Sequence, residues 1–229
     1  MLLGTWGMNL WRQQQLKKLA DNPLRHYYER PFPSASSDCR ALEFVALDLE
    51  TTGLNPSQDV ILSMGYVNLH GLQIALSSAT HHLLCPNRAI PEQSAVIHCI
   101  TDDQAAGGKR MEDMLPELLQ RLTGRVMIAH YASLELKFLD QICRQLYGGP
   151  FRIPVVDTQR IAKRVLERRN QIIRGSDLRL AECRRRHGLP HYRMHNALSD
   201  ALAAAELFLV QLAHYGDQKP VALKHFLSP

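Results

Sequence analysis

The sequence predicts an α/β protein built on a mixed sheet. Three strand-like runs follow one another between residues 44 and 84. His70-Gly71 forms a turn between the last two runs, which indicates antiparallel pairing. After residue 111, helix-like and strand-like segments alternate, a pattern typical of strands joined through helices that cover a sheet. We therefore expect a central mixed five-stranded sheet with helices on both faces.

Length and composition fit a globular protein with one main domain. Of the 229 residues, 45% are hydrophobic and 21% charged, and no apolar run approaches the roughly 20 residues of a membrane span. Five scattered cysteines, odd in number and never in a CxxC pair, favour a reducing, cytoplasmic location over a disulfide framework or a zinc ribbon. We expect an N-terminal helical appendage and linker (1–40), a main domain (41–215) and a C-terminal tail (216–229).

The first half of the chain is expected to begin with a short helix and to continue as strands. Met8 to Ala20 has an apolar edge suited to a helix, and the stretch from Pro31 to Ser37 is typical of a linker. Phe44 to Leu49 is a short apolar run, typical of a strand buried on both faces. Val60–Leu69 and Leu72–Leu84 follow as the two strands of a hairpin.

The second half is expected to alternate helices and strands. Residues 90–108 read as irregular chain with short helical turns. Leucines at 115, 118, 119 and 122 predict a helix with Pro116 near its first turn, and Gly124 lies just past its end. Further strands are expected at 125–129 and 153–157, and further helices at about 132–147 and 198–214.

Two carboxylates close the first buried strand. Asp48 and Glu50 are two positions apart, so their side chains leave the strand on the same face. Two adjacent anions repel, and a buried strand has no structural use for them. Since hard divalent cations prefer carboxylate oxygens, the pair predicts a metal site. A strand that merely ends in a polar loop is the alternative.

A third acid lies on the apolar face of a predicted helix. Glu135 precedes Phe138 by three residues and Leu139 by four, so it shares their inward face. A charge at an inward position is costly unless it is paired or bound to a metal. The alternative is an acid placed in the first turn by the helix dipole and facing a gap.

The last predicted helix opens with a fourth acid. From Asp200 to Leu212 only three residues are polar, Asp200 included, so the helix should be buried nearly all round, with Asp200 in its first turn. His195 precedes the cap-like Ser199 and is expected in the loop that leads into the helix. From there its ring can reach the same site.

Together, three segments resemble the exonuclease motifs of the DEDDh 3′–5′ exonucleases, a family that includes the proofreading subunit of bacterial DNA polymerase III. They are Asp48-x-Glu50-Thr-Thr-Gly53, His130-x-x-x-x-Glu135 and His195-x-x-x-x-Asp200-Ala. Ile97-His98-Cys-Ile100-Thr101 looks like the family's usual Ile-His-Gly-Ile-Thr segment. The likeness extends from about Leu42 to His214 and implies an RNase H-like fold, with 41–215 as an exonuclease domain.

The resemblance also implies a reaction. The chain would hydrolyse the terminal phosphodiester of single-stranded or frayed DNA from its 3′ end, releasing 5′-mononucleotides. Four acids around one site need counter-ions, and the family pattern supplies two divalent cations, Mg²⁺ or Mn²⁺, in a two-metal mechanism. Histidine's unperturbed pKa of about 6.5 suits a general base near neutral pH.

Individual roles follow from the family pattern. The metal ligands would be Asp48, Glu50, Glu135 and Asp200, which together with the general base His195 form the catalytic set. The terminal nucleotide would be held by Thr51, Thr52, Leu54 and His98.

Three residues depart from that pattern. Glu135 stands where the family usually has Asp, Tyr131 where Asn is frequent, and Cys99 where Gly is common. The longer Glu135 must still hold the second metal, directly or through water.

Positive charge is concentrated in one segment. Ten Lys or Arg and only three acids lie between Arg160 and Arg186, so this segment carries +7 while the rest of the chain carries −2. A basic block beside acidic motifs predicts a polyanionic ligand, with nucleic acid as the first choice. A solvated helix face is the alternative.

Three other functions remain open on the sequence. The chain could be an RNA-trimming exoribonuclease of the same family, a nucleic-acid-binding module with weakened catalysis, or a polymerase-associated subunit. We expect a nucleic acid with a 3′ end as partner, DNA before RNA. A polymerase or repair partner is expected at the terminal segments, and no membrane.

Overall fold

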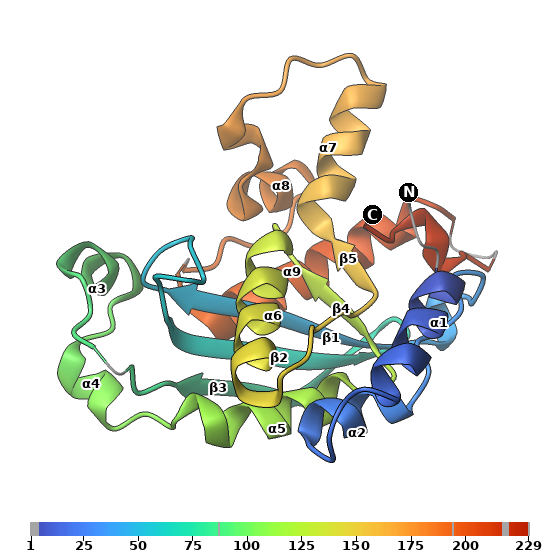
Figure 1. The fold of residues 1–229 in the computed structure, drawn as a ribbon. Coiled ribbons are helices and arrows are strands. Elements are labelled where there is room, and N and C mark those ends of the chain that lie inside the picture. The colour runs from blue at the N-terminus through green and yellow to red at the C-terminus, as the bar shows by residue number, and fades with distance from the viewer. Residues whose placement is uncertain (1–4, 87, 194, 217–219, 229) are drawn as a thin grey trace.

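The centre of the protein is a five-stranded sheet (Figure 1). The computed structural model describes residues 5–86, 88–193, 195–216 and 220–228. The strands are β1 (Glu43–Thr51), β2 (Ile61–His70), β3 (Gln73–Leu83), β4 (Val126–Ala129) and β5 (Val155–Asp157). The helices are α1 (Thr5–Leu16), α2 (Pro23–Glu29), α3 (Glu92–His98), α4 (Asp102–Ala106), α5 (Met111–Leu122), α6 (Ser133–Tyr147), α7 (Thr158–Arg168), α8 (Leu180–Arg186) and α9 (Ala197–Ala213).

The sheet is mixed, as predicted. Its strand order is β3-β2-β1-β4-β5. β1 pairs antiparallel with β2, which pairs antiparallel with β3, whereas β4 and β5 join on the other side in parallel. β1 is therefore the central strand. Asp48 and Glu50 lie near its C-terminal end, with two strands of the sheet on either side.

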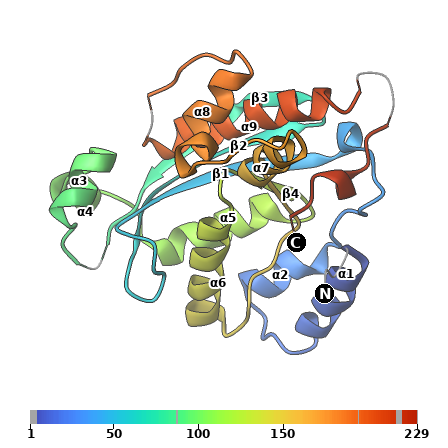
Figure 2. The ribbon, with the colours of Figure 1, turned by 90° about the horizontal axis from the view of Figure 1, so that it is seen from above.

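Helices cover both faces of the sheet (Figure 2). On one face, Val45 and Leu47 of β1 belong to a core that includes residues of α2, α5 and α6. On the other face, Phe44 and Ala46 belong to a core with Phe208 of α9. Because side chains alternate along a strand, Asp48 and Glu50 share the α9 face of the sheet. The prediction of a last helix that is buried nearly all round is confirmed.

The N-terminal segment contains a helix that the sequence did not lead us to expect. α2 begins after Asn22, whose side chain accepts a hydrogen bond from the N–H of Arg25, and α1 ends at Leu16, earlier than expected. Tyr27 and Tyr28 of α2 are buried, and their hydroxyls donate to the carbonyls of residues 152 and 150. α2 thus packs into the main core rather than standing apart as an appendage.

The C-terminal segment also packs onto the domain. Val221, Leu223 and Phe226 are buried in the α9 core, and the N–H of Cys39 donates to the Val221 carbonyl. The domain boundaries at residues 40 and 215 stay predictions. None of the helices in the described ranges has the length and apolar character needed to cross a membrane.

The remaining elements fall close to their expected positions, with two shifts. α5 begins at Met111, because acids at 112 and 113 suit its first turn, and Pro116 therefore lies beyond that turn. α9 is capped by Asn196, whose side chain accepts from the N–H of Ser199, so Ser199 is inside the helix rather than its cap.

Candidate active site

Carboxylates from separate segments meet at the end of β1. One oxygen each of Asp48, Glu50 and Asp200 lie within 4.8 Å of one another. Glu50 and Asp200 are each only 6% exposed. The first turn of α9 therefore brings its acid to the central strand, as the sequence predicted.

A glycine allows α9 to approach this closely. Gly65 of β2 lies directly opposite Asp48 in the antiparallel pair. A Cβ on Gly65 would lie 2.1 Å from the nitrogen of Leu198 and 2.2 Å from the carbonyl carbon of Ala197. Since no side chain fits there, Gly65 is required for the position of Asp200. The sequence carries a signal for this role, a glycine inside a strand, which can mark a close backbone approach.

Glu135 reaches the same acids from the opposite layer. It lies in the first turn of α6 and is 2% exposed, so the predicted inward orientation is confirmed. Burial and then the negative charges of Asp157 and Glu50 raise its pKa to about 8, against the opposing effect of a backbone hydrogen bond. The negative charge of Glu135 raises the pKa of Asp48 more than the charge of any other residue does.

The acids disfavour one another's ionised forms. Burial, followed by the charges of Glu135, Glu50 and Asp200, raises the pKa of Asp48 well above its ordinary value. Burial also raises the pKa of Asp200 to about 6, although the backbone N–H of His195 opposes the shift. Burial and mutual repulsion thus favour the binding of protons or of a cation by these carboxylates.

Three buried carboxylate oxygens have no hydrogen-bond partner among the described residues. They are Glu50 Oε1, Glu135 Oε2 and Asp200 Oδ1. Buried polar atoms are normally satisfied, and unsatisfied ones are costly. A hard divalent cation bound by carboxylate oxygens would satisfy them and offset their charge, so the residues present fit such an ion.

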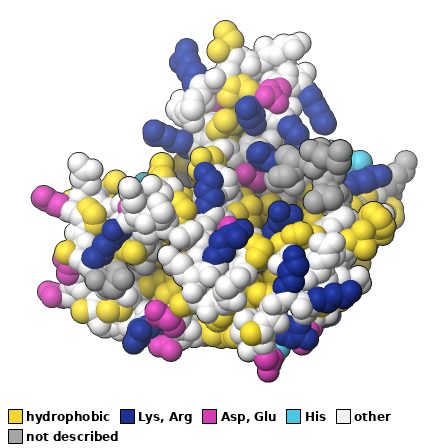
Figure 3. Space-filling model, in the orientation of Figure 1, with side chains coloured by type: hydrophobic (Ala, Val, Ile, Leu, Met, Phe, Trp, Pro, Cys, Tyr) yellow, Lys and Arg dark blue, Asp and Glu magenta, His cyan; other side chains and the backbone are white. Residues whose placement is uncertain are grey.

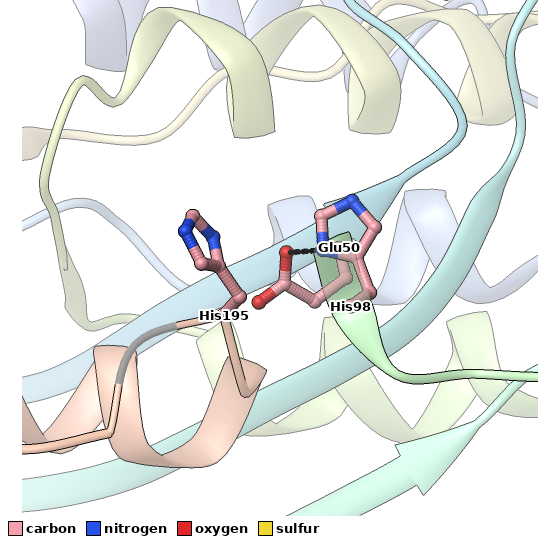
Figure 4. A group of neighbouring side chains, drawn as sticks. All are labelled: Glu50, His98 and His195. Atoms are coloured by element: carbon pink, nitrogen blue, oxygen red, sulfur yellow. Dashed lines mark ion pairs between the residues drawn. The ribbon is translucent and has the colours of Figure 1, made fainter. Parts of the chain in front are cut away.

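Two histidines flank Glu50 (Figure 4). His98, at the end of α3, places Nδ1 2.6 Å from Glu50 Oε2. His195 lies in the loop before α9, as predicted, with a left-handed backbone (φ 66°) and its N–H donating to Asp200 Oδ2 at 2.9 Å. The His195 side chain is exposed. The centroids of the His98 and His195 rings are 6.1 Å apart.

The other residues expected to hold a nucleotide have mixed surroundings. Thr51 is buried and donates to the Gly53 carbonyl. The Thr52 hydroxyl donates to Asp59 and accepts from the N–H of Val60, so it is engaged within its own turn. Leu54 is 73% exposed and therefore accessible to a ligand.

Asp157 and His130 support the site from behind. Asp157 caps α7 by accepting from the N–H groups of Gln159 and Arg160. It also accepts from the N–H groups of residues 131 and 132, which fixes the chain just before Glu135. Both ring nitrogens of His130 are engaged, one with Thr158 and one with the carbonyl of residue 178.

The basic block divides into buried and exposed charges. Arg184 is only 2% exposed. It pairs with Glu206 at 2.7 Å, donates to the carbonyls of Ala203 and Pro190, and stacks over the Tyr192 ring at 4.4 Å. Arg184 therefore holds the loop before His195 against α9. On the sequence it is one of the charges expected to bind a polyanion, but in the structure it is buried and cannot contact a ligand.

Other cations of the block remain on the surface. Arg160, Arg168, Arg169, Arg174 and Arg179 are exposed. In Figure 3, dark blue side chains gather on the projecting part of the molecule that Figure 1 assigns to α7 and α8. A basic surface therefore stands on the α7–α8 side of the acidic site.

Comparisons with known proteins agree with this geometry. The model of a family described as an exonuclease (RNase T) matches residues 45–208. The DNA polymerase III subunit epsilon of Treponema pallidum is 31% identical over 186 residues, which are 81% of this chain and 84% of that protein. The DNA polymerase III PolC-type protein of Thermotoga maritima is 34% identical over 166 residues, but the chain spans only 12% of its length.

Solved structures with the same fold include two exonucleases. Exonuclease X in complex with 5′ overhanging duplex DNA has a TM-score of 0.59 at 22% identity, covering 80% of this chain and 98% of that one. Escherichia coli Exonuclease I with a dA16 oligonucleotide has a TM-score of 0.64 at 14% identity, covering 76% of this chain and 42% of that one. The shared fold is the RNase H-like fold that the sequence led us to expect.

Proposed function

The chain belongs to the exonuclease family whose model it matches, and from that premise we propose that it is a metal-dependent 3′–5′ exonuclease of the DEDDh type. Its substrate is DNA with a single-stranded or frayed 3′ end. Water attacks the terminal phosphorus, the bond from phosphorus to the 3′ oxygen breaks, and a 5′-mononucleotide leaves.

One observation carries this proposal. Acids from β1, α6 and α9 converge, and three of their buried oxygens have no partner among the described residues. A structural role would leave these oxygens hydrogen-bonded. Metal-assisted phosphoryl hydrolysis needs such a set of oxygen ligands.

Asp48, Glu50, Glu135 and Asp200 are the proposed ligands of two divalent cations, Mg²⁺ or Mn²⁺. When bound, the cations supply positive charge that stabilises the attacking and leaving oxygens of the displacement. Glu135 enters from a separate layer and lies outside the group of three oxygens within 4.8 Å, which suits a ligand directed to a second cation.

His195 is the proposed general base. Its ring is exposed, so water reaches it, and one of its ring nitrogens lies within 4.8 Å of a Glu50 oxygen. An unprotonated ring nitrogen takes the proton from the attacking water. The N–H contact to Asp200 and the position of α9 orient the loop that carries the ring.

Leu54, Thr51, Thr52 and His98 are the proposed nucleotide contacts, and of these only Leu54 is exposed. Leu54 offers an apolar surface for a terminal base. The exposed arginines of α7 and of the segment that follows bind phosphates, which gives salt-sensitive affinity without sequence preference. DNA is proposed over RNA because the relatives reported above are named as DNA polymerase III proteins.

A trimming assay tests the proposal. With a 5′-labelled single-stranded oligonucleotide, 3′–5′ action gives a descending ladder, whereas the opposite polarity releases labelled mononucleotide at once. Mg²⁺ or Mn²⁺ should support the ladder and a chelator should abolish it. Asp48→Asn and His195→Gln should each slow trimming by at least about 10²-fold, while Asp113→Asn, an exposed acid on α5, should not.

Matched DNA and RNA oligomers in the same assay separate the two substrate classes. Trimming at the wild-type rate by both site variants, or in excess chelator, refutes the proposed mechanism. A folded protein that binds oligonucleotides but takes up no Mn²⁺ in a calorimetric titration would instead be a binding module.

A polymerase or repair partner is proposed at the N-terminal segment. Trp6 of α1 is 78% exposed and Leu10 is 44% exposed, one helical turn apart. Truncation would remove the core residues of α2, so Trp6→Ala is the cleaner test. It should reduce co-purification with the partner and leave the rate of trimming unchanged.

A further inference from the structure

A second set of metal ligands overlaps the carboxylate site. One nitrogen of His98, one nitrogen of His195 and one oxygen of Glu50 lie within 4.8 Å of one another. Figure 4 shows the carboxylate of Glu50 between the two imidazoles, which come from the α3 end and from the loop before α9. Glu50 is the residue that this set shares with the group Asp48, Glu50 and Asp200.

The two sets differ in their chemical preference. The carboxylate group offers only oxygen, which suits Mg²⁺ or Mn²⁺. Two imidazoles and one carboxylate are typical of zinc, and catalytic zinc sites use this composition with one open position. Mg²⁺ rarely takes nitrogen ligands from protein, so it does not compete well for this second set.

The second set includes a carboxylate with an oxygen unpartnered in the described chain and borders a cavity that Arg193 also lines. Glu50 is only 6% exposed, and its Oε1 has no partner among the described residues. His98 and His195 both line a cavity of about 410 Å³, which they share with His81 and the exposed Cys99. The cavity gives an ion access from solvent and room for a water in the fourth position.

The spacing requires only side-chain movement. Two ligands of a tetrahedral zinc lie roughly 3.4 Å apart, given metal–ligand distances of about 2.1 Å. His98 Nδ1 and Glu50 Oε2 are now 2.6 Å apart, so they must separate slightly. His195 is exposed and can move inward.

We propose that Glu50, His98 and His195 form a zinc site that excludes Mg²⁺ and inhibits the enzyme when occupied. Zinc bound there withdraws Glu50 from the magnesium site and blocks the ring nitrogen of His195. The inhibition rests on the proposed function, whereas the zinc binding does not. Hydrolysis would therefore stop at zinc concentrations far below those of Mg²⁺.

Direct zinc binding tests the site without any enzymatic readout. The 229-residue chain, in excess Mg²⁺, competes with a chromogenic chelator for Zn²⁺. We expect one tight site in the wild type and at least about 10-fold weaker binding in His98→Gln and in His195→Gln, because each loses one of three protein ligands. Co²⁺ in place of Zn²⁺ should give the visible absorption of a four-coordinate site, which is lost in both variants.

The chain offers a matched control. His187 Nδ1 and His214 Nε2 are 3.2 Å apart, at the C-terminal ends of α8 and α9, and no carboxylate takes part in this contact. His214→Ala removes this second histidine pair and should leave the tight site intact. Thermal unfolding confirms that each variant is folded.

The results separate cleanly. Absence of tight zinc binding in excess Mg²⁺, or equal affinity in the wild type and both site variants, overturns the proposal. In the latter case the carboxylate group alone binds the ion. If tight zinc binding depends on both histidines but no trimming occurs with any metal, the zinc site stands and the proposed exonuclease function fails. Inhibition of each trimming variant is measured against its own rate without zinc.

Discussion

Removal of the buried guanidinium of Arg184 should destabilise the fold and slow the reaction. In Arg184→Met, Glu206 loses its cationic partner at 2.7 Å and keeps the hydrogen bond from the Tyr192 hydroxyl, and the carbonyls of Ala203 and Pro190 lose their donors. The stacking over Tyr192 disappears as well. Breaking a buried ion pair by removing one partner costs about 3–5 kcal/mol.

The magnitude follows from the exposure of the two partners. The side chain of Arg184 is 3% exposed, whereas that of Glu206 is 26% exposed and is partly hydrated after the substitution. We therefore expect a loss near the lower limit, about 3 kcal/mol in the free energy of unfolding. The neighbouring Arg185 pairs with Glu182 at 2.7 Å, but its side chain is 73% exposed. Arg185→Met should therefore cost less than about 1 kcal/mol.

Urea unfolding of both variants checks this difference. Arg184→Met should also lower kcat with little change in KM, because the arginine holds the loop before His195 and does not touch substrate. The double variant Arg184→Met with Glu206→Gln should recover part of the stability, since it removes the unpaired charge. If Arg184→Met matches Arg185→Met within about 1 kcal/mol, the guanidinium does not hold this region together.

Three further predictions concern the site and its surface. The raised pKa of Glu135 (about 8) and of Asp200 (about 6) mean that the folded state binds protons more tightly than the unfolded one. These two groups therefore contribute stability to the metal-free protein that is complete below about pH 4 and is lost as the pH rises through 6 and 8, so Mg²⁺ should raise Tm most at pH 8; an equal effect of Mg²⁺ on Tm at about pH 5 and at pH 8 would contradict this. Gly65→Ala should lower the free energy of unfolding by about 1–3 kcal/mol and should slow trimming, because the added methyl group displaces α9. Gly175→Ala, at a position with open space around it, should do neither. Equal unfolding curves for the two variants would show that α9 adjusts freely. Charge reversal of Arg168 and Arg169 should lower the slope of log K against log salt by roughly 1.4 for single-stranded DNA, while reversal of the exposed Lys17 and Lys18 should not; an unchanged slope would leave these arginines as solvated surface.

Local patterns predicted most of the sheet and the acids. A buried strand with acids two positions apart, and an apolar helix that opens with an acid, are visible within a few residues of sequence. α2 and the roles of Gly65 and Arg184 depend on contacts between distant segments. Gly65 matters because α9 lies over it, and Arg184 matters because Glu206 faces it. Neither partner is identified by sequence spacing, so these roles required the structure.

Buried acids at strand ends are another case in which the role of a residue depends on contacts that sequence spacing does not identify. Asp48 and Asp157 both close or nearly close a strand, and the sequence alone offers little to distinguish a ligand from a cap. In the structure, Asp157 accepts hydrogen bonds from four backbone N–H groups, so its charge is used to hold the chain. Asp48 instead faces Glu135, Glu50 and Asp200, which raise its pKa. The fold keeps this second group together through the packing of β1 and α9, at a cost in stability that a bound cation offsets. That cost is the physical reason to assign chemistry to Asp48 and structure to Asp157.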